Sequence, residues 1–134
     1  MDFRDDLQFL AWTVAQESQG EPELGQLGVA WVVMNRALER GQSVSDVVLD
    51  RSQFSCWNTD SPTRKSLDTV PDLVSRQAYK ASVAAYFNLS PDPTKGAQFY
   101  LNPEVVKKVA GKLPSWYDPA KVTLIVGNHH FLRL

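Results

Sequence analysis

The sequence predicts an α+β fold that is mostly helical, with a small antiparallel sheet near the carboxyl end. Apolar residues recur every three or four positions over much of residues 5–40 and 71–88, which is the spacing of helices that bury one face. Val122–Val126 and His129–Leu132 are short apolar runs on either side of Gly127-Asn128, a pattern typical of two strands around a turn. The chain has no internal repeat or convincing linker, so we expect one domain over residues 1–134.

The first helix is expected from about Asp5 to Ser18. Gly20 can end it in a left-handed cap, and Pro22 biases the residue before it away from helical geometry. Polar residues then separate this helix from the next one.

The second helix is expected over about 23–40 and ends at Gly41. Gly25 and Gly28 lie inside it, where each costs up to about 1 kcal/mol relative to Ala. We therefore expect another helix to approach the backbone closely at these two positions.

Shorter elements follow. Ser45 can cap a helix over 46–49, and the polar stretch 59–69 is expected to be a loop. A third long helix is expected over about 71–88, and residues 98–101 form a candidate strand before an Asn-Pro pair.

Composition excludes several function classes. The 134 residues are 43% hydrophobic and 22% charged, with a net charge of −1, so no global field attracts nucleic acid or an anionic membrane. The lone Cys56 excludes an internal disulfide and a multi-cysteine zinc site, and we interpret it as a packed thiol. No segment approaches the roughly 20 apolar residues that span a bilayer. The acidic amino terminus is unlike a secretion signal, so we expect a protein made in the cytoplasm. We also expect a monomer.

Glu17 is the strongest candidate catalytic residue. Counting from Leu10 and Val14 by helical spacing places its carboxylate in register with the buried face of the first helix. Desolvation there would raise its pKa and keep a proton available, as a general acid for glycosidic-bond cleavage requires. The alternative is a surface glutamate in the last turn.

Glu21 is a second carboxylate four residues later. Gly20 and Pro22 indicate that the helix has already ended, so Glu21 need not face Glu17. A two-carboxylate hydrolase needs its pair about 5 or about 6.5–9.5 Å apart, which spacing alone does not give. The alternative is a polar residue near the start of the second helix, where the helix dipole favours it.

His129 and His130 are adjacent, so on a strand they point to opposite faces. One of these histidines and Glu17 could serve as zinc ligands, but the sequence has no His-x-x-x-His motif and no cysteine pair to support a zinc site. A structural or supporting histidine is the preferred interpretation.

Several aromatic residues fall in predicted loops or at strand ends rather than on helix stripes. Sugar rings have apolar faces and polar rims, so exposed aromatic walls with nearby amides suit them. The aromatic residues are Trp57, Tyr100, Trp116 and Tyr117, and the amides are Asn58 and Asn102. The alternative, for at least half of these residues, is ordinary packing beneath loops.

These residues also form motifs that resemble the SleB-type cell wall hydrolases. Residues 15–22 resemble that family's Ala-x-Glu-Ala-Arg-Gly-Glu motif, with Ser18 and Gln19 in place of Ala and Arg. Losing the Arg removes a bidentate partner for an anion or carboxylate. Further matches occur in the family's order: Gly25–Arg36, Asp46-Val-Val, Gln53-Phe54-Ser55, Gly96–Pro103 and Ile125–Phe131.

The resemblance implies a lysozyme-like domain that cleaves peptidoglycan glycan strands between N-acetylmuramic acid and N-acetylglucosamine. The SleB type acts as a lytic transglycosylase, needs no cofactor or metal, and uses its first motif glutamate, here Glu17, as the acid. The motif positions imply that further residues line or support the cleft: Glu21, Phe54, Ser55, Tyr100, Asn102 and His129.

Two alternatives stay open beside this function. One is a zinc-dependent peptidoglycan amidase using His129 and Glu17, and the other is a non-catalytic glycan-binding module. With no visible signal or wall-binding domain, the sequence indicates a phage or prophage endolysin released through a membrane pore, or an excised catalytic domain.

Overall fold

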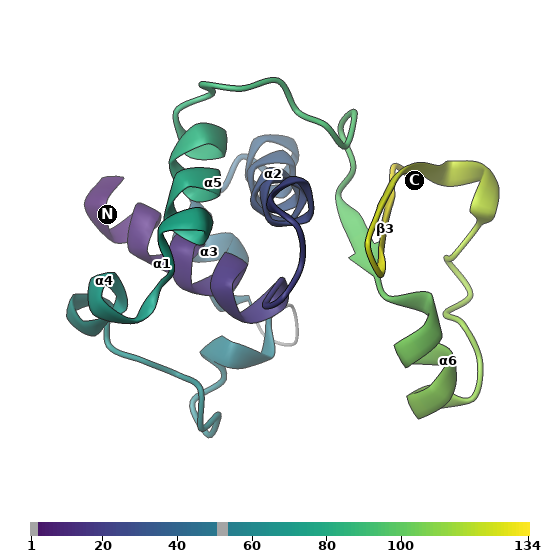
Figure 1. The fold of residues 1–134 in the computed structure, drawn as a ribbon, viewed down its shortest axis with the longest axis horizontal. Helices are drawn as coiled ribbons and strands as arrows, with labels where there is room; N and C mark the ends of the chain where they lie inside the picture. Colours follow the sequence, from purple (N-terminus) through teal and green to yellow (C-terminus); the bar gives the residue numbers. More distant parts are fainter. Residues whose placement is uncertain (1–2, 51–53) are drawn as a thin grey trace.

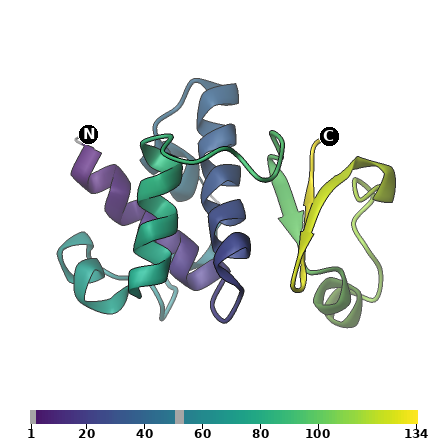
Figure 2. The ribbon, with the colours of Figure 1, turned by 45° about the horizontal axis from the view of Figure 1, so that its top comes forward.

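A computed structural model describes residues 3–50 and 54–134. Figure 1 shows a group of helices beside a smaller part that holds the sheet and one helix. In both Figure 1 and Figure 2, α2 lies between the rest of this helix group and the sheet. The helices are α1 (Phe3–Glu17), α2 (Glu23–Arg40), α3 (Val44–Leu49), α4 (Val70–Leu73), α5 (Arg76–Tyr86) and α6 (Pro103–Ala110), with short 3-10 turns η1 (Ser55–Trp57), η2 (Leu67–Thr69) and η3 (Pro119–Lys121).

The core lies between α1, α2, α3 and α5, with α1 and α2 each in contact with the other three helices. The apolar stripe predicted for α1 is buried at Leu10, Ala11 and Val14, all fully inaccessible. Gly20 has φ +80°, so the predicted left-handed break after α1 is confirmed. The predicted bounds of α2 are confirmed, and Gly41 ends it with φ 62° while its N–H reaches the carbonyls of the last turn.

The sheet has three antiparallel strands in the order β1-β3-β2. β3 (His129–Leu132) pairs on one side with β1 (Phe99–Leu101) and on the other with β2 (Val122–Val126). The predicted strands around the Gly127-Asn128 turn are therefore confirmed. The mostly helical α+β fold class is confirmed with them.

The close approach to α2 comes from the sheet, so the expected neighbouring helix is wrong. A Cβ on Gly28 would lie 2.6 Å from Cζ of Phe131 on β3, and one on Gly25 would lie 3.4 Å from Val126 on β2. Gly28 thus lets a buried aromatic ring rest on the helix backbone. Sequence spacing identified the close approach but not the element that makes it.

Three other expectations need correction. Ser43, not Ser45, caps α3, because its side chain accepts from the Asp46 N–H in a reciprocal capping box. The long helix expected over 71–88 is broken at Val74, and Ser75 caps the second piece. α6 was missed, although Pro103 at its first turn after an Asn is a typical helix start.

No helix within the described residues is both long and apolar enough to cross a membrane.

Candidate active site

Glu17 ends α1 and is half-buried, and its carboxylate meets the sheet. The Tyr100 hydroxyl on β1 donates a hydrogen bond of 2.6 Å to Oε1 of Glu17. Burial, and then the charge and hydrogen bond of Glu17, raise the pKa of Tyr100 well above its ordinary value. The Tyr100 hydroxyl therefore keeps its proton and acts as a donor to the carboxylate.

Glu21 and His129 form a second buried contact close to the first. Oε1 of Glu21 lies 2.8 Å from Nδ1 of His129, and each side chain is only 10% exposed. Gly127 makes room for this pair, since a Cβ there would lie 2.4 Å from Oε2 of Glu21. The His129 ring meets the Tyr100 ring edge-on at 5.3 Å.

Burial lowers the pKa of His129, against the opposing charges of Glu21 and Glu17. The imidazole is therefore neutral at neutral pH. Glu21 faces a neutral, buried partner and is not free to act as an open carboxylate in the cleft.

Arg36 on α2 is a member of the site that sequence reasoning missed. It is 7% exposed, and its Nε donates a hydrogen bond of 2.6 Å to the Gln98 carbonyl just before β1. Its guanidinium stacks over the rings of Phe54 at 5.3 Å and Phe99 at 5.6 Å. Its charge and that of Glu17 act on one another, although burial lowers the pKa of Arg36 overall.

A signal for Arg36 was present in the sequence. It follows Val29, Val32 and Val33 at helical spacing, so a permanently charged group falls on the buried stripe of α2. A buried charge without a structural reason at that position points to a site.

Cys56 is also near Glu17, and the interpretation as a packed thiol is confirmed. The side chain is 3% exposed, and burial, followed by the charge of Glu17, raises the pKa of Cys56 to about 12. Such a thiol is a poor nucleophile.

Two of the residues expected to line or support the cleft make structural contacts, with Arg36 and with the backbone of α6. Phe54 is 2% exposed and packs beneath Arg36, so it supports that guanidinium, and its contact with substrate stays a prediction. Asn102 is the N-cap of α6, where its Oδ1 accepts from the Val105 N–H at 3.2 Å. The side chain of Ser55 lies outside the described part of the chain, as does Gln53.

Of the aromatic residues expected to form exposed walls, some are packed in the protein and one is open to solvent. Trp57 is 4% exposed and donates to Oγ1 of Thr13 at 2.8 Å, so it belongs to the core. Tyr117 contacts Nδ1 of His130 at 2.9 Å. Trp116 alone of the three is open, at 38% exposure.

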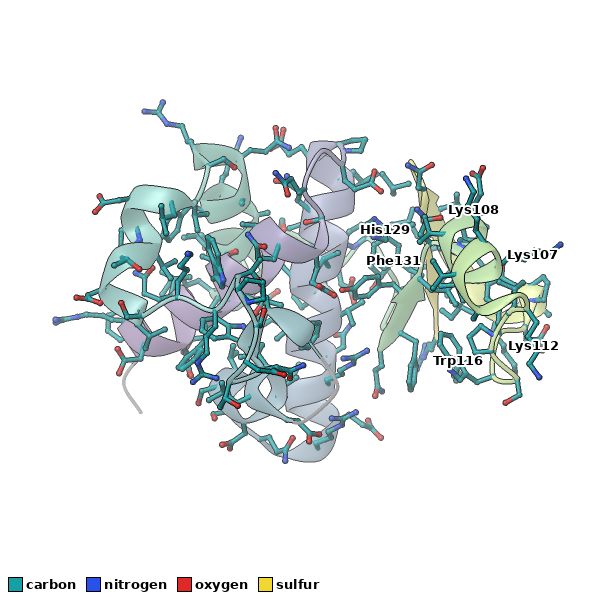
Figure 3. All side chains as sticks on the ribbon, turned by 90° about the horizontal axis from the view of Figure 1, so that it is seen from below. Lys107, Lys108, Lys112, Trp116, His129 and Phe131 are labelled. Atoms are coloured by element: carbon teal, nitrogen blue, oxygen red, sulfur yellow. The ribbon has the colours of Figure 1, made fainter. Side chains whose placement is uncertain are left out.

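The two adjacent histidines lie on opposite faces of β3, as expected. His129 points toward α2 in Figure 3, beside Phe131, whereas His130 meets Tyr117 on the other face. The zinc alternative joined His129 to Glu17, but the structure pairs His129 with Glu21. Within residues 3–50 and 54–134, no group of three or more His, Cys, Asp or Glu side chains is arranged to hold a metal ion.

A cavity of about 510 Å³ touches α1 at Phe9. Phe9 lies about two turns before Glu17 on the same face of α1, and the cavity is lined by Phe9 but not by Thr13 or Glu17. Hydroxyl and basic side chains line most of the rest of this cavity, from Thr59, Ser61, Arg64, Lys65 and Ser66, and Trp57 and Leu67 complete it.

The Cell Wall Hydrolase family matches residues 20–132 of this sequence. The chain belongs to the cell wall hydrolase family. The matched range begins after Glu17, so this family match does not include that residue.

The relatives are spore cortex-lytic enzymes. That of Bacillus cereus is 29% identical over 132 residues, which cover 97% of this chain and 45% of the relative. That of Halalkalibacterium halodurans is 29% identical over 102 residues, covering 75% of this chain and 28% of the relative. The chain thus spans less than half the length of these curated relatives.

Solved structures extend the similarity to the fold. The catalytic domain of the germination-specific lytic transglycosylase SleB from Bacillus anthracis has a TM-score of 0.68 and 28% identity, covering 96% of this chain and 94% of that domain. The catalytic domain of the Bacillus cereus SleB protein gives 0.69 and 29%, covering 96% and 90%. The resemblance to SleB-type hydrolases is therefore confirmed, and the fold is that of a SleB catalytic domain.

Proposed function

We propose that this chain is a peptidoglycan-cleaving domain that acts as a lytic transglycosylase, with Glu17 as its single acid and base. The hydrogen bond from Tyr100 to Glu17 carries the proposal, because it fixes one carboxylate where the helices meet the sheet. Similarity to a lytic transglycosylase over nearly the whole chain supports the reaction type.

The bond to be cleaved joins N-acetylmuramic acid to N-acetylglucosamine. Since Tyr100 donates to Oε1 of Glu17, the transferable proton belongs on Oε2. Glu17 gives this proton to the glycosidic oxygen as positive charge develops at the muramic acid anomeric carbon. The bond to the leaving sugar then breaks.

The second half of the reaction uses the same carboxylate. Ionised Glu17 takes the proton of the C6 hydroxyl of muramic acid, whose oxygen closes on the anomeric carbon to give a 1,6-anhydro product. The Tyr100 hydrogen bond stabilises the ionised form between the two steps. No second carboxylate is needed, which agrees with the engagement of Glu21 by His129.

Substrate binding draws on the cavity beside α1. A cavity of about 510 Å³ with hydroxyl and cationic groups suits a sugar ring with its substituents. We assign it to the glycan strand, with Trp57 as a packed floor.

The test is digestion of purified peptidoglycan by the protein and by Glu17→Gln, with products identified by mass spectrometry. We expect anhydromuramyl products from the protein and none from the variant, which should unfold like the parent because the amide is nearly isosteric. Reducing-end muramic acid would indicate hydrolysis with a second carboxylate, and unchanged cleavage by the variant would contradict the role of Glu17.

Two further arms address the alternatives. Activity that disappears on chelation and returns with zinc would favour an amidase. Binding of glycan without any product would favour a non-catalytic module.

Delivery to the wall by phage-type release stays a prediction. We expect bacteria that express the chain to lyse only when a pore-forming protein is co-expressed, and lysis without the pore would contradict this route.

A further inference from the structure

The charge of the chain is divided along its length. Residues 1–94 carry eight basic and thirteen acidic side chains, whereas residues 95–134 carry six basic and two acidic ones. The near-zero net charge therefore conceals a positive sheet region beside a negative helical region. A local positive surface can attract an anionic partner even when the whole molecule cannot.

Three of the cations gather on α6 and the turn after it. Lys107, Lys108 and Lys112 are exposed, and none takes part in an ion pair within the described residues. Figure 3 shows them on the side of the sheet opposite to His129 and Phe131, with Trp116 near the end of the sheet. We call Lys107, Lys108, Lys112 and Trp116 the α6 surface.

α6 itself has little packing role. No residue of this helix is buried, and Val109 is 82% exposed. Lysines in the last turn of a helix interact favourably with its dipole, by up to about 1 kcal/mol each. This interaction does not explain Lys112, which lies beyond the end of α6. The α6 surface is therefore free to serve binding.

The α6 surface is connected to the candidate active site. The Trp116 ring stacks on Phe99 at 5.4 Å, and Phe99 carries the Arg36 guanidinium on its ring. α6 also begins directly after the strand that holds Tyr100. Lys107 lies roughly 6 Å along the helix axis from its first residue.

We propose that the α6 surface binds the carboxylates of the stem peptide carried by the muramic acid unit of the substrate. This rests on the proposed function, because it assumes that a peptidoglycan strand lies at Glu17. Stem peptides branch from muramic acid and carry free carboxylates, and a four-residue peptide spans about 13–14 Å when extended. Three ammonium groups without an ion pair in the described residues, on the helix that follows the strand of Tyr100 and the turn after it, match that charge.

The experiment measures binding of the Glu17→Gln protein to insoluble peptidoglycan freed of teichoic acid, by co-sedimentation at low salt. We expect Lys107→Gln, Lys108→Gln and Lys112→Gln together to raise the half-saturation concentration about tenfold, the sum of three exposed charge contacts. High salt should weaken the parent more than this triple variant.

The matched control removes three other lysines, with Lys80→Gln, Lys95→Gln and Lys121→Gln in the same background. Its binding should stay close to that of the parent, and an equal loss in both triple variants would overturn a local surface. Amidation of the stem carboxylates should bring the parent to the level of the α6 triple variant. Binding that is insensitive to amidation but dependent on added teichoic acid would overturn the assignment to stem peptides.

A cleavage assay distinguishes failure of this binding proposal from failure of the proposed function. With Glu17 intact, the α6 triple variant should cleave soluble, peptide-free glycan strands at the parent rate. A parent that cleaves no glycan would contradict the proposed function, while the sedimentation results would still decide whether the α6 surface binds stem carboxylates. Thermal unfolding of each variant checks that α6 is intact.

Discussion

The side chain that meets Glu17 determines what its carboxylate can do. A tyrosine hydroxyl that keeps its proton can donate a hydrogen bond to a carboxyl group whether or not that group is protonated. The hydrogen bond is strongest when the carboxyl group is ionised. In the proposed reaction, Tyr100 therefore helps the leaving group depart by stabilising the conjugate base of the acid.

Tyr100→Phe removes this donor and leaves the ring in place. A hydrogen bond to a charged group contributes about 1.5–3 kcal/mol, so we expect kcat on peptidoglycan to fall roughly 10- to 150-fold with little change in KM. Steady-state rates of wall solubilisation measure this. Tyr117→Phe is the control, because its hydroxyl contacts His130 on the other face of the sheet. Equal rates for Tyr100→Phe and the parent would show that the hydrogen bond has no catalytic part.

Cys56 allows a chemical test of the packing around Glu17. Since burial and the charge of Glu17 raise the pKa of Cys56 to about 12, the folded protein should resist iodoacetamide at pH 8 and react fully in urea. Mass spectrometry counts the added groups. Glu17→Gln should resist as well, because burial is the larger cause, and rapid native alkylation would show that the thiol is open.

At the scale of elements, the contact of α2 with β3 depends on the absence of a side chain at Gly28. An alanine Cβ there would lie 2.6 Å from Cζ of the fully buried Phe131 ring. Overpacking costs about 1–3 kcal/mol, which exceeds the helical gain of up to about 1 kcal/mol from replacing glycine. We expect Gly28→Ala to lower the free energy of unfolding in urea by about 1–2 kcal/mol.

Gly25→Ala is the matched control on the same helix. Its Cβ would meet Glu21 and Val126 at 3.3 and 3.4 Å, where small shifts suffice. We expect a smaller loss than at Gly28, and the reverse order would contradict the assignment of Phe131 as the tight contact.

Helical spacing and turn residues were sufficient to predict α1, α2 and the β2–β3 hairpin, because these elements follow local rules. The break at Val74 was not predicted, because a serine can lie inside a helix as well as cap one. In the structure the Ser75 side chain accepts from the Ala78 N–H and caps α5. Glu17 was found from periodicity and motif together. Arg36 was missed because its partners, Gln98 and Phe99, are more than 60 residues away in the sequence.

The motifs alone do not give the roles of Phe54 and Asn102 at the site. Phe54 and Asn102 lie in motifs that the resemblance places at the cleft, but a motif position does not say whether a residue touches substrate or holds one that does. The structure shows Phe54 beneath a buried guanidinium and Asn102 at a helix cap. Phe54 therefore supports the site through Arg36, whereas Asn102 holds the start of the helix that follows β1.

At the scale of the whole molecule, a few side-chain contacts join the helices to the sheet at this site. Tyr100 reaches Glu17 and His129 reaches Glu21, so the two carboxylates flanking Gly20 each receive one group from the sheet. The His129 contact is the titratable one near neutral pH, and it couples protonation to the stability of the whole fold.

The sign of that coupling follows from burial. Because the pKa of His129 is lowered in the folded state, the unfolded chain binds a proton there more readily as pH falls below the ordinary value of about 6.5. The contribution of neutral His129 is thus complete above pH 6.5 and is lost as pH falls toward the lowered pKa. The loss reaches at most about 1.4 kcal/mol per pH unit.

We therefore expect the parent to lose more stability than His129→Gln between pH 7 and pH 5, although the variant starts less stable. Urea unfolding at several pH values measures both slopes. His130→Gln is the control, because it leaves His129 and its contact with Glu21 in place and should keep the parental slope. If the stability advantage of the parent over His129→Gln grows between pH 7 and pH 5, the charge of Glu21 outweighs burial, and the pair is an ion pair that strengthens in acid.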